Sequence, residues 1–209
     1  MITYEKHRSA INYLYRQYDE NLQFHSHFHE SFELIYVYEG EISVVIEKEI
    51  YTIKKGQCLL IMPNQIHSYF TKKYSKTFIL IFAYSYVATF YKYSLLYCSK
   101  KPYFNLENEE RILEVLQSDG NIYLQKSILY YLVYLYSSGE SVPRDNKYNT
   151  LMQKVLIYVD KNYHQKLTLK NLSTELGYDY HYLSGVINEG FGSNFLSYVN
   201  EYRINKICE

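Results

Sequence analysis

The 209-residue chain has no tryptophan, only three prolines and three cysteines, and no excess of charge of either sign. Its 22 basic residues are balanced by 22 acidic ones. A strongly basic balance often marks proteins that bind nucleic acid or anionic membranes, and it is missing here. Any contact with DNA must therefore depend on local geometry rather than on net charge.

The cysteines Cys58, Cys98 and Cys208 show no spacing typical of a metal site, and their odd number fits no closed set of disulfides. This usage suits a reducing compartment. The charged N-terminal segment lacks an apolar core of the length found in signal peptides. The longest uncharged stretch, Thr77–Tyr91, is shorter than the ~20 residues that a membrane helix needs. We therefore expect a cytoplasmic protein without a membrane segment.

Aromatic and β-branched residues gather in short runs between residues 22 and 84. Each run is bounded by glycine, proline or asparagine, which is typical of antiparallel strands in a barrel or sandwich. Turns are predicted at Glu39-Gly40, at Lys54–Gly56 and at Pro63-Asn64. The predicted strands are Leu34–Tyr38, Ile42–Ile46, Ile50–Ile53, Gln57–Met62 and Phe78–Tyr84.

Apolar residues then recur at helical spacing in Leu106–Gln117 and, more strongly, in Asn121–Tyr136. These two helices could cover the strands or form a dimer seam, and the spacing alone leaves both roles open. The small and polar segment Ser137–Asn146 is the one obvious linker. We predict domains at residues 1–136 and 151–209, with a linker at 137–150.

The C-terminal segment alternates helices with turns. Leu151–Asn162 is amphipathic, and Thr168 stands at the N-cap position of a second helix that Gly177 ends. Asp179 is the N-cap candidate for Tyr180–Asn188. A last helix follows Ser193, with Phe195, Leu196, Val199 and Ile204 predicted to face inward. Two short helices joined by a tight turn are typical of a helix-turn-helix, although other small helical bundles share the pattern.

The residues themselves resemble the first half of the DNA-binding domain of AraC-type transcription regulators. The matching positions are Thr168-Leu169, Leu172, Leu176-Gly177-Tyr178, Tyr182-Leu183-Ser184, Phe191-Gly192, Phe195, Tyr198 and Arg203-Ile204. The resemblance implies that Tyr180–Asn188 is a recognition helix. His181, Ser184 and Gly185 would then meet base edges, and Tyr182 and Asn188 would meet phosphates.

Three departures from this family weaken the prediction of tight DNA binding. The family usually has arginine where this chain has Gly185, an aromatic residue at Ile187 and lysine at Asn188. The segment is also neutral, with six basic and six acidic residues: Lys154, Lys161, Lys166, Lys170, Arg203 and Lys206 against Asp160, Glu175, Asp179, Glu189, Glu201 and Glu209. Finally, the sequence stops at Cys208-Glu209, inside the helix that joins the family's two helix-turn-helix units. The resemblance therefore leads us to expect a DNA-binding domain without its second unit, and a truncated regulator that acts only by dimerisation is an alternative.

The stretch His25–Glu33 is the most chemically suggestive part of the chain. Residues two apart on a strand share a face, so His27, His29 and Glu33 are expected to lie together. With His67 they form a set suited to a transition metal. The set resembles the first and second motifs of the cupin superfamily, although Gln65 replaces a usual glycine. Because cupins include metal-dependent enzymes, a metal-dependent cupin enzyme is an alternative function.

Sensing domains of AraC-type regulators resemble the same stretch, and there the pocket commonly holds a small organic effector without a metal. We therefore predict an α+β protein: an N-terminal cupin-like antiparallel β-barrel with packed helices, followed by an all-α helix-turn-helix segment. The expected function is effector-modulated, sequence-specific DNA binding by a homodimer. We expect no cofactor and no catalytic residue, with His27, His29, Glu33 and His67 as ligand-binding residues.

Overall fold

The computed structural model describes residues 2–5, 8, 12–106, 109–118, 120–144 and 147–208. The chain divides into two compact units, Glu5–Arg144 and Met1–Tyr4 with Asp145–Glu209. The boundary falls inside the predicted linker at 137–150. Part of that segment is regular structure, because α3 (Ile122–Ser137) ends in it, β11 (Ser141–Pro143) lies in it and α4 (Lys147–Asn162) begins in it.

Two antiparallel sheets that share strand β4 build the N-terminal unit. The first half of β4 pairs with β6 and β8, and its second half pairs with β5 and β7. Strand β2 pairs with β8, β10 with β6, and β3 with β7. The bounds are β2 (Leu14–Glu20), β3 (Phe24–Phe28), β4 (Phe32–Ile46), β5 (Glu49–Lys54), β6 (Gln57–Ile61), β7 (His67–Phe70), β8 (Ser75–Phe82) and β10 (Tyr103–Asn105).

Strand β4 runs through the position where the sequence predicted a turn. Gly40 has a φ of +71°, and the pairing register with β8 shifts between Val37 and Glu39. The prediction of a turn at Glu39-Gly40 was therefore wrong: glycine permits a bend that carries one strand from the first sheet into the second.

Alternate residues of β4 enter two different hydrophobic cores. Ile35 and Val37 lie between the two sheets, whereas Leu34 and Tyr36 face the opposite side of the first sheet. A strand buried on both faces loses the alternation of apolar and polar residues. This explains the continuous apolar run in the first half of β4.

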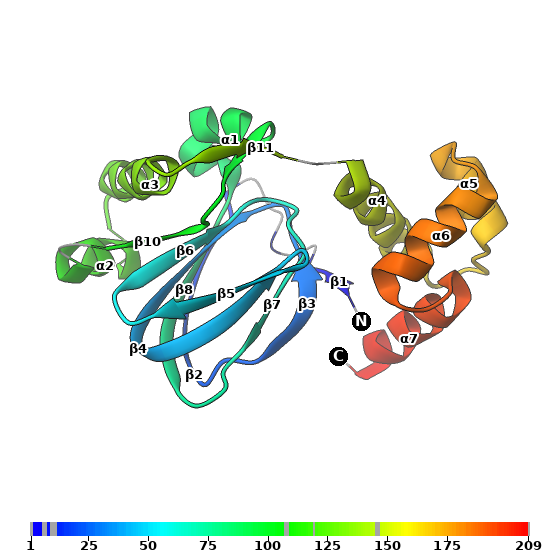
Figure 1. Ribbon diagram of the computed structural model, residues 1–209, viewed down its shortest axis with the longest axis horizontal. Coiled ribbons are helices and arrows are strands. Elements are labelled where there is room, and N and C mark those ends of the chain that lie inside the picture. Colours follow the sequence, from blue (N-terminus) through cyan, green and yellow to red (C-terminus); the bar gives the residue numbers. More distant parts are fainter. Residues whose placement is uncertain are drawn as a thin grey trace. The chain divides into compact units, whose positions relative to one another are not determined.

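Helices cover the outer face of the first sheet, and Figure 1 shows α1 and α3 above β6 and β10, with α2 beside the end of β10. Leu113 of α2 and Leu129 of α3 pack there with Leu80 of β8. The predicted helices correspond to α2 and α3, whereas β2 and α1 were not predicted. The bounds are the 3-10 helix η2 (Tyr84–Val87), α1 (Ala88–Ser94), α2 (Glu109–Gln117) and α3, with β9 (Tyr97–Ser99) pairing β11.

The strand pairings observed within the described residues do not close into a ring. The predicted barrel is therefore correct in its antiparallel, cupin-like strands but not in its closure. No helix in the described ranges has the length and apolar character needed to cross a bilayer.

Four helices form the C-terminal unit together with β1 (Thr3–Tyr4): α4, α5 (Leu169–Leu176), α6 (Tyr180–Phe191) and α7 (Phe195–Cys208). Thr168 caps α5 by accepting a hydrogen bond from the Asn171 N–H, and Asp179 caps α6 in the same way. Gly177 ends α5 in the left-handed conformation. These three caps confirm the predictions from sequence.

The buried stripe of α7 differs from the predicted one. Phe195 and Val199 are buried as predicted, but Leu196 and Ile204 are 57% and 62% exposed. Tyr198 and Tyr202 complete the stripe at spacings of three and four residues. A predominantly aromatic stripe therefore replaces the expected aliphatic one.

Candidate functional site

Four side chains from three strand regions meet between the two sheets. His27 belongs to β3, Glu33 to β4 and His67 to β7, while His29 follows β3 directly. His27 and His67 are opposed in the β3–β7 pairing, and their ring centroids are 4.1 Å apart. All four are at most 1% exposed, and one ligand atom from each lies within 4.8 Å of the others. The structure thus brings together the whole set that was predicted from the sequence.

Each of the three imidazoles directs its Nδ1 atom towards a backbone carbonyl oxygen. The distances are 3.0 Å from His27 to His25, 3.0 Å from His29 to Ser31, and 2.8 Å from His67 to Gln65. An Nδ1–H that donates to a carbonyl leaves the Nε2 lone pair free, which is the usual arrangement of a histidine that binds a metal. The backbone therefore orients three Nε2 atoms towards one point.

Glu33 lies at the centre of this arrangement. Its Oε2 atom is 2.8 Å from Nε2 of His29 and 3.3 Å from Nε2 of His67, and its Oε1 atom accepts a hydrogen bond of 2.7 Å from the Tyr69 hydroxyl. Nε2 of His27 is buried without any hydrogen-bond partner among the described residues. Sequence reasoning missed Tyr69, although its position two residues after His67 places it on the same face of β7.

Burial keeps His27 and His29 neutral, whereas hydrogen bonding keeps the Glu33 carboxylate charged. Burial lowers the pKa of His29 and lowers that of His27 well below its usual range. Burial alone would raise the pKa of Glu33, but hydrogen bonds to His29 and His67 hold it well below the usual value. A neutral His29 carries one ring N–H, but its two ring nitrogens each face a hydrogen-bond acceptor: Nδ1 faces the Ser31 carbonyl and Nε2 faces the Glu33 carboxylate. One of these two contacts therefore lacks a proton. A cation at the centre would remove this conflict.

The donor set fits a divalent transition metal. Three imidazole nitrogens and one carboxylate oxygen suit zinc, iron, manganese, nickel or copper. The unpartnered Nε2 of His27 is the strongest sign, because buried polar atoms are rarely left without a partner. His27, His29, Glu33 and His67 would hold the ion, and Tyr69 would orient Glu33.

An organic molecule has little room beside these four residues. The adjacent cavity is lined by Arg8, Gln17, Leu22, Phe24, Glu33, Tyr69, Ile79 and Ile81, and its accessible volume is about 30 Å³. That space suits about one water molecule, whereas pockets for small molecules usually measure ~300–1,000 Å³. The role of the four residues in binding an organic effector thus stays a prediction, with a metal the better fit by size.

A second buried carboxylate lies in the tight turn between β4 and β5. Burial raises the pKa of Glu47 to about 7, although Arg144 opposes the shift, and its Oε1 atom has no partner in the described part of the chain. Arg144 itself donates hydrogen bonds to the carbonyls of Ser94 and Pro63. At alkaline pH the folded state therefore carries a poorly solvated negative charge.

Replacing this carboxylate should change how stability depends on pH. Because the folded-state pKa of Glu47 is raised, its contribution to stability is lost as pH rises from about 4.5 to about 7. We expect Glu47→Gln to stabilise the protein at pH ~8 by about 1–3 kcal/mol and to have little effect at pH ~5. Urea denaturation at both pH values measures this, with exposed Glu49→Gln as the control. An equal effect of Glu47→Gln at both pH values would contradict the assignment.

The residues expected to contact DNA lie on α6. His181, Tyr182, Gly185 and Asn188 are exposed, and Ser184 is half-buried. His181, Ser184, Gly185 and Asn188 are spaced by three or four residues and so share one face of the helix. The opposite face is buried through Leu183, Val186 and Ile187. The structure thus makes the five residues available to a partner, and their contact with DNA stays a prediction.

Comparison with known proteins finds a family match inside the N-terminal unit. Residues 11–82 match the profile of the AraC-like ligand binding domain. A search of curated proteins finds no significant match. The prediction of an AraC-type sensing domain is therefore confirmed for these residues.

Solved structures of ToxT from Vibrio cholerae share the fold. One is 16% identical and covers 93% of this chain and 80% of its own, with a TM-score of 0.54. A second, bound to (E)-4-(8-methylnaphthalen-1-yl)but-3-enoic acid, is also 16% identical, with 92% and 80% coverage and a TM-score of 0.56. A third, bound to an unsaturated fatty acid, is 18% identical, with 93% and 78% coverage and a TM-score of 0.54.

Proposed function

We propose that this protein is a cytoplasmic, dimeric, DNA-binding transcription regulator of the AraC type, controlled by a ligand in its N-terminal unit. One observation carries the proposal: an AraC-like ligand-binding domain is followed in the same chain by capped helices, and the combined fold resembles ToxT. A match to a ligand-binding domain also favours regulation over catalysis. The structures of ToxT with bound fatty acid show that this fold accommodates a small molecule in that protein.

DNA binding is assigned to the pair α5 and α6. The two helices are joined by Gly177, Tyr178 and Asp179, and α6 would enter the major groove as the second helix of a helix-turn-helix. Its exposed face offers an imidazole, a hydroxyl and an amide, but no lysine or arginine. The affinity of a single copy is therefore expected to be modest and strongly dependent on salt.

Fluorescence anisotropy tests this proposal. The purified chain is titrated onto DNA from upstream of its own gene and onto scrambled DNA of equal length, at low and moderate salt. Tighter binding to the upstream DNA than to the scrambled DNA would support the proposed function as a DNA-binding regulator. Equal, weak binding that salt abolishes would reject autonomous DNA recognition and favour a regulator-derived protein that acts through dimerisation.

Introducing an arginine on α6 should strengthen DNA binding. Gly185 is exposed in mid-helix, and a Cβ atom there would meet nothing within 4 Å. We expect Gly185→Arg to raise DNA affinity roughly ten-fold, because arginine adds a phosphate or guanine contact. Gly185→Ala is the first control, because it stabilises the helix without adding charge. Ser197→Arg is the second control, because it adds the same positive charge at an exposed position of α7. An equal gain from Ser197→Arg would show that charge alone is responsible.

Dimerisation is assigned to the exposed face of α3. Tyr123 and Tyr134 are 80% and 65% exposed, and Tyr130 and Tyr131 lie on the same side. Lys126 is the only charged residue of this helix. An exposed helix face with so many aromatic residues is usually buried against another protein surface. We therefore expect a second copy of the chain to bind this face of α3.

The dimer interface is tested by introducing charge into it. We expect Tyr130→Glu combined with Tyr134→Glu to weaken the dimer at least about thirty-fold, because it places two charges in a desolvated contact. Sedimentation equilibrium measures the dissociation constant. Ile50→Glu, at a 63% exposed position of β5, is the control. A dimer that survives the α3 substitutions would place the interface elsewhere.

A second candidate function, metal binding between the sheets, is supported by the unpartnered Nε2 of His27 and the four convergent ligand atoms. A bound divalent ion would add positive charge and Lewis acidity at this buried position. In a regulator it would serve as the sensed ligand or as a structural centre. The same donor set in a metal-dependent cupin enzyme is the alternative.

A further inference from the structure

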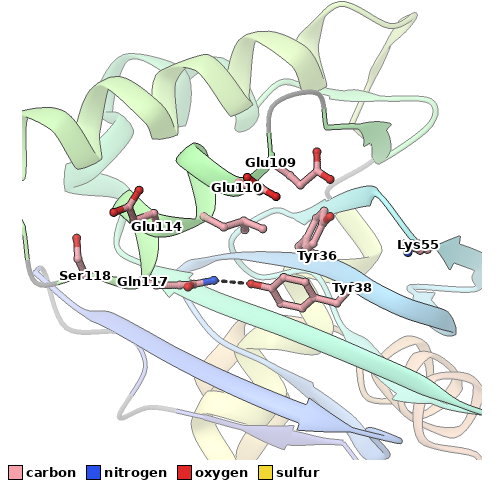
Figure 2. Close-up of a pocket in the computed structure, with 9 residues that line it drawn as sticks. Tyr36, Tyr38, Lys55, Glu109, Glu110, Glu114, Gln117 and Ser118 are labelled. Carbon is pink, nitrogen blue, oxygen red and sulfur yellow. Dashed lines mark hydrogen bonds between the residues drawn. The ribbon is translucent and has the colours of Figure 1, made fainter.

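A larger cavity lies on the other side of the first sheet, between α2 and β4 (Figure 2). Its volume is about 620 Å³, within the usual range for small-molecule sites. The lining residues are Tyr36, Tyr38, Lys55, Glu109, Glu110, Leu113, Glu114, Gln117 and Ser118. Because Tyr36 and Glu33 face opposite sides of β4, this cavity is separate from the histidine cluster.

Tyr36 places a hydroxyl group in the lining of this cavity. Its side chain is only 3% exposed, and its hydroxyl is not among the buried polar atoms that lack a partner in the described ranges, which is consistent with a hydroxyl that opens onto the cavity. Figure 2 shows it rising from the sheet towards Glu109 and Glu110 of α2. Burial, followed by the negative charge of Glu109, raises its pKa to about 12, so the hydroxyl stays protonated. The neighbouring Tyr38 hydroxyl, in contrast, accepts a hydrogen bond from Gln117.

The charges around the cavity are predominantly negative. Three carboxylates of α2, those of Glu109, Glu110 and Glu114, face one ammonium group, that of Lys55. Carboxylates in the first turn of a helix are stabilised by the helix dipole, which accounts for Glu109 and Glu110 without any ligand. The helix dipole does not explain the carboxylate of Glu114, which lies in the second turn of α2, or the position of Tyr36 in the lining of the same cavity.

We propose that the cavity between α2 and β4 binds a linear aliphatic diamine in its doubly protonated form. The two ammonium groups would pair with carboxylates of α2, and one of them would also donate a hydrogen bond to the Tyr36 hydroxyl. The methylene chain would pack on Leu113 and the tyrosine rings, which form the apolar part of the lining. The excess of two negative charges among the lining residues matches the charge of the ligand. If the chain is the regulator proposed above, the diamine is its effector.

Isothermal titration calorimetry with cadaverine tests the proposal, in the presence of a chelator and without DNA. We expect one molecule to bind per chain, with an affinity that falls as salt is raised. Pentylamine, with a single charge, should bind at least about ten-fold more weakly, and the dianion glutarate should not bind. Because neither metal nor DNA is present, failure here is distinguishable from failure of the proposed function.

Matched variants assign the contacts. Glu109→Gln combined with Glu114→Gln should weaken cadaverine binding at least about ten-fold, and Tyr36→Phe about three- to ten-fold. Glu140→Gln, an exposed carboxylate that pairs with Lys100 outside this cavity, should leave binding unchanged. Circular dichroism melting confirms that each variant is folded. No cadaverine binding at millimolar concentration, or binding that the Glu109 and Glu114 substitutions leave intact, would overturn the proposal.

Discussion

Chelator-treated protein is expected to melt about 10 °C higher when zinc or nickel is added in large excess over the dissociation constant. The physical reason is that an ion would neutralise Glu33 and engage the lone pair of His27, which has no partner in the described part of the chain. Differential scanning calorimetry measures the shift. Elemental analysis of protein purified without chelator measures the metal content.

Variants of the ligands make this test specific. His27→Gln and His67→Gln should each weaken metal binding at least about a hundred-fold and abolish the rise in melting temperature. His164→Gln removes an exposed histidine of the other unit and should change neither. Acid should weaken metal binding only below the usual range of imidazole titration, because burial lowers the pKa of His27 and of His29 and so keeps both rings deprotonated to lower pH.

The possible outcomes separate the functional alternatives. Stoichiometric metal together with selective DNA binding would indicate a metal-containing regulator. Stoichiometric metal without DNA binding would favour the metal-dependent cupin enzyme. Sub-stoichiometric metal that does not change in the His27 and His67 variants would remove the metal site altogether.

Gly40→Ala is expected to destabilise the N-terminal unit by about 3–5 kcal/mol, one of the largest effects available from a single methyl group. Gly40 has a φ of +71°, and its added Cβ atom would lie 2.1 Å from the carbonyl oxygen of Tyr74. That oxygen also accepts a hydrogen bond from the Glu41 N–H, so it cannot move without disturbing β4. The methyl group would therefore force apart β4 and the start of β8.

Gly56→Ala provides a matched control. Gly56 has a similar φ of +80°, but a Cβ atom there would meet nothing within 4 Å. Gly56→Ala should lower the free energy of unfolding by only about 1–2 kcal/mol, because alanine is less stable than glycine in the left-handed conformation. Urea denaturation of both variants measures the difference. Similar costs for the two would show that backbone conformation, and not the contact with Tyr74, explains the role of Gly40.

The features that could be predicted from the sequence depend on residues close together in the chain. The caps at Thr168, Gly177 and Asp179 follow from one side chain or one backbone angle each, so local chemistry was sufficient. Histidines two apart on a strand share a face for the same reason. The boundaries of α2 and α3 followed from their helical periodicity to within a few residues.

The features that were missed depend on packing between distant segments. Strand β2 was not predicted because its exposed and half-buried residues lack a strong apolar alternation, and its pairing with β8 defines it. Leu196 and Ile204 were placed inward because aliphatic residues usually are, whereas Tyr198 and Tyr202 fill the interior.

The sequence by itself determined the antiparallel strands, the capped C-terminal helices and the shared face of His27, His29 and Glu33, because each follows from short-range patterns. Only the tertiary structure decided that β4 continues through Gly40, that the space beside Glu33 measures about 30 Å³, and that Tyr36 lines one cavity together with the carboxylates of α2. These outcomes depend on how segments far apart in the chain pack together, such as Gly40 with Ser75 and Tyr36 with Glu109. Side-chain volume and burial set such contacts, and short-range sequence patterns do not contain them.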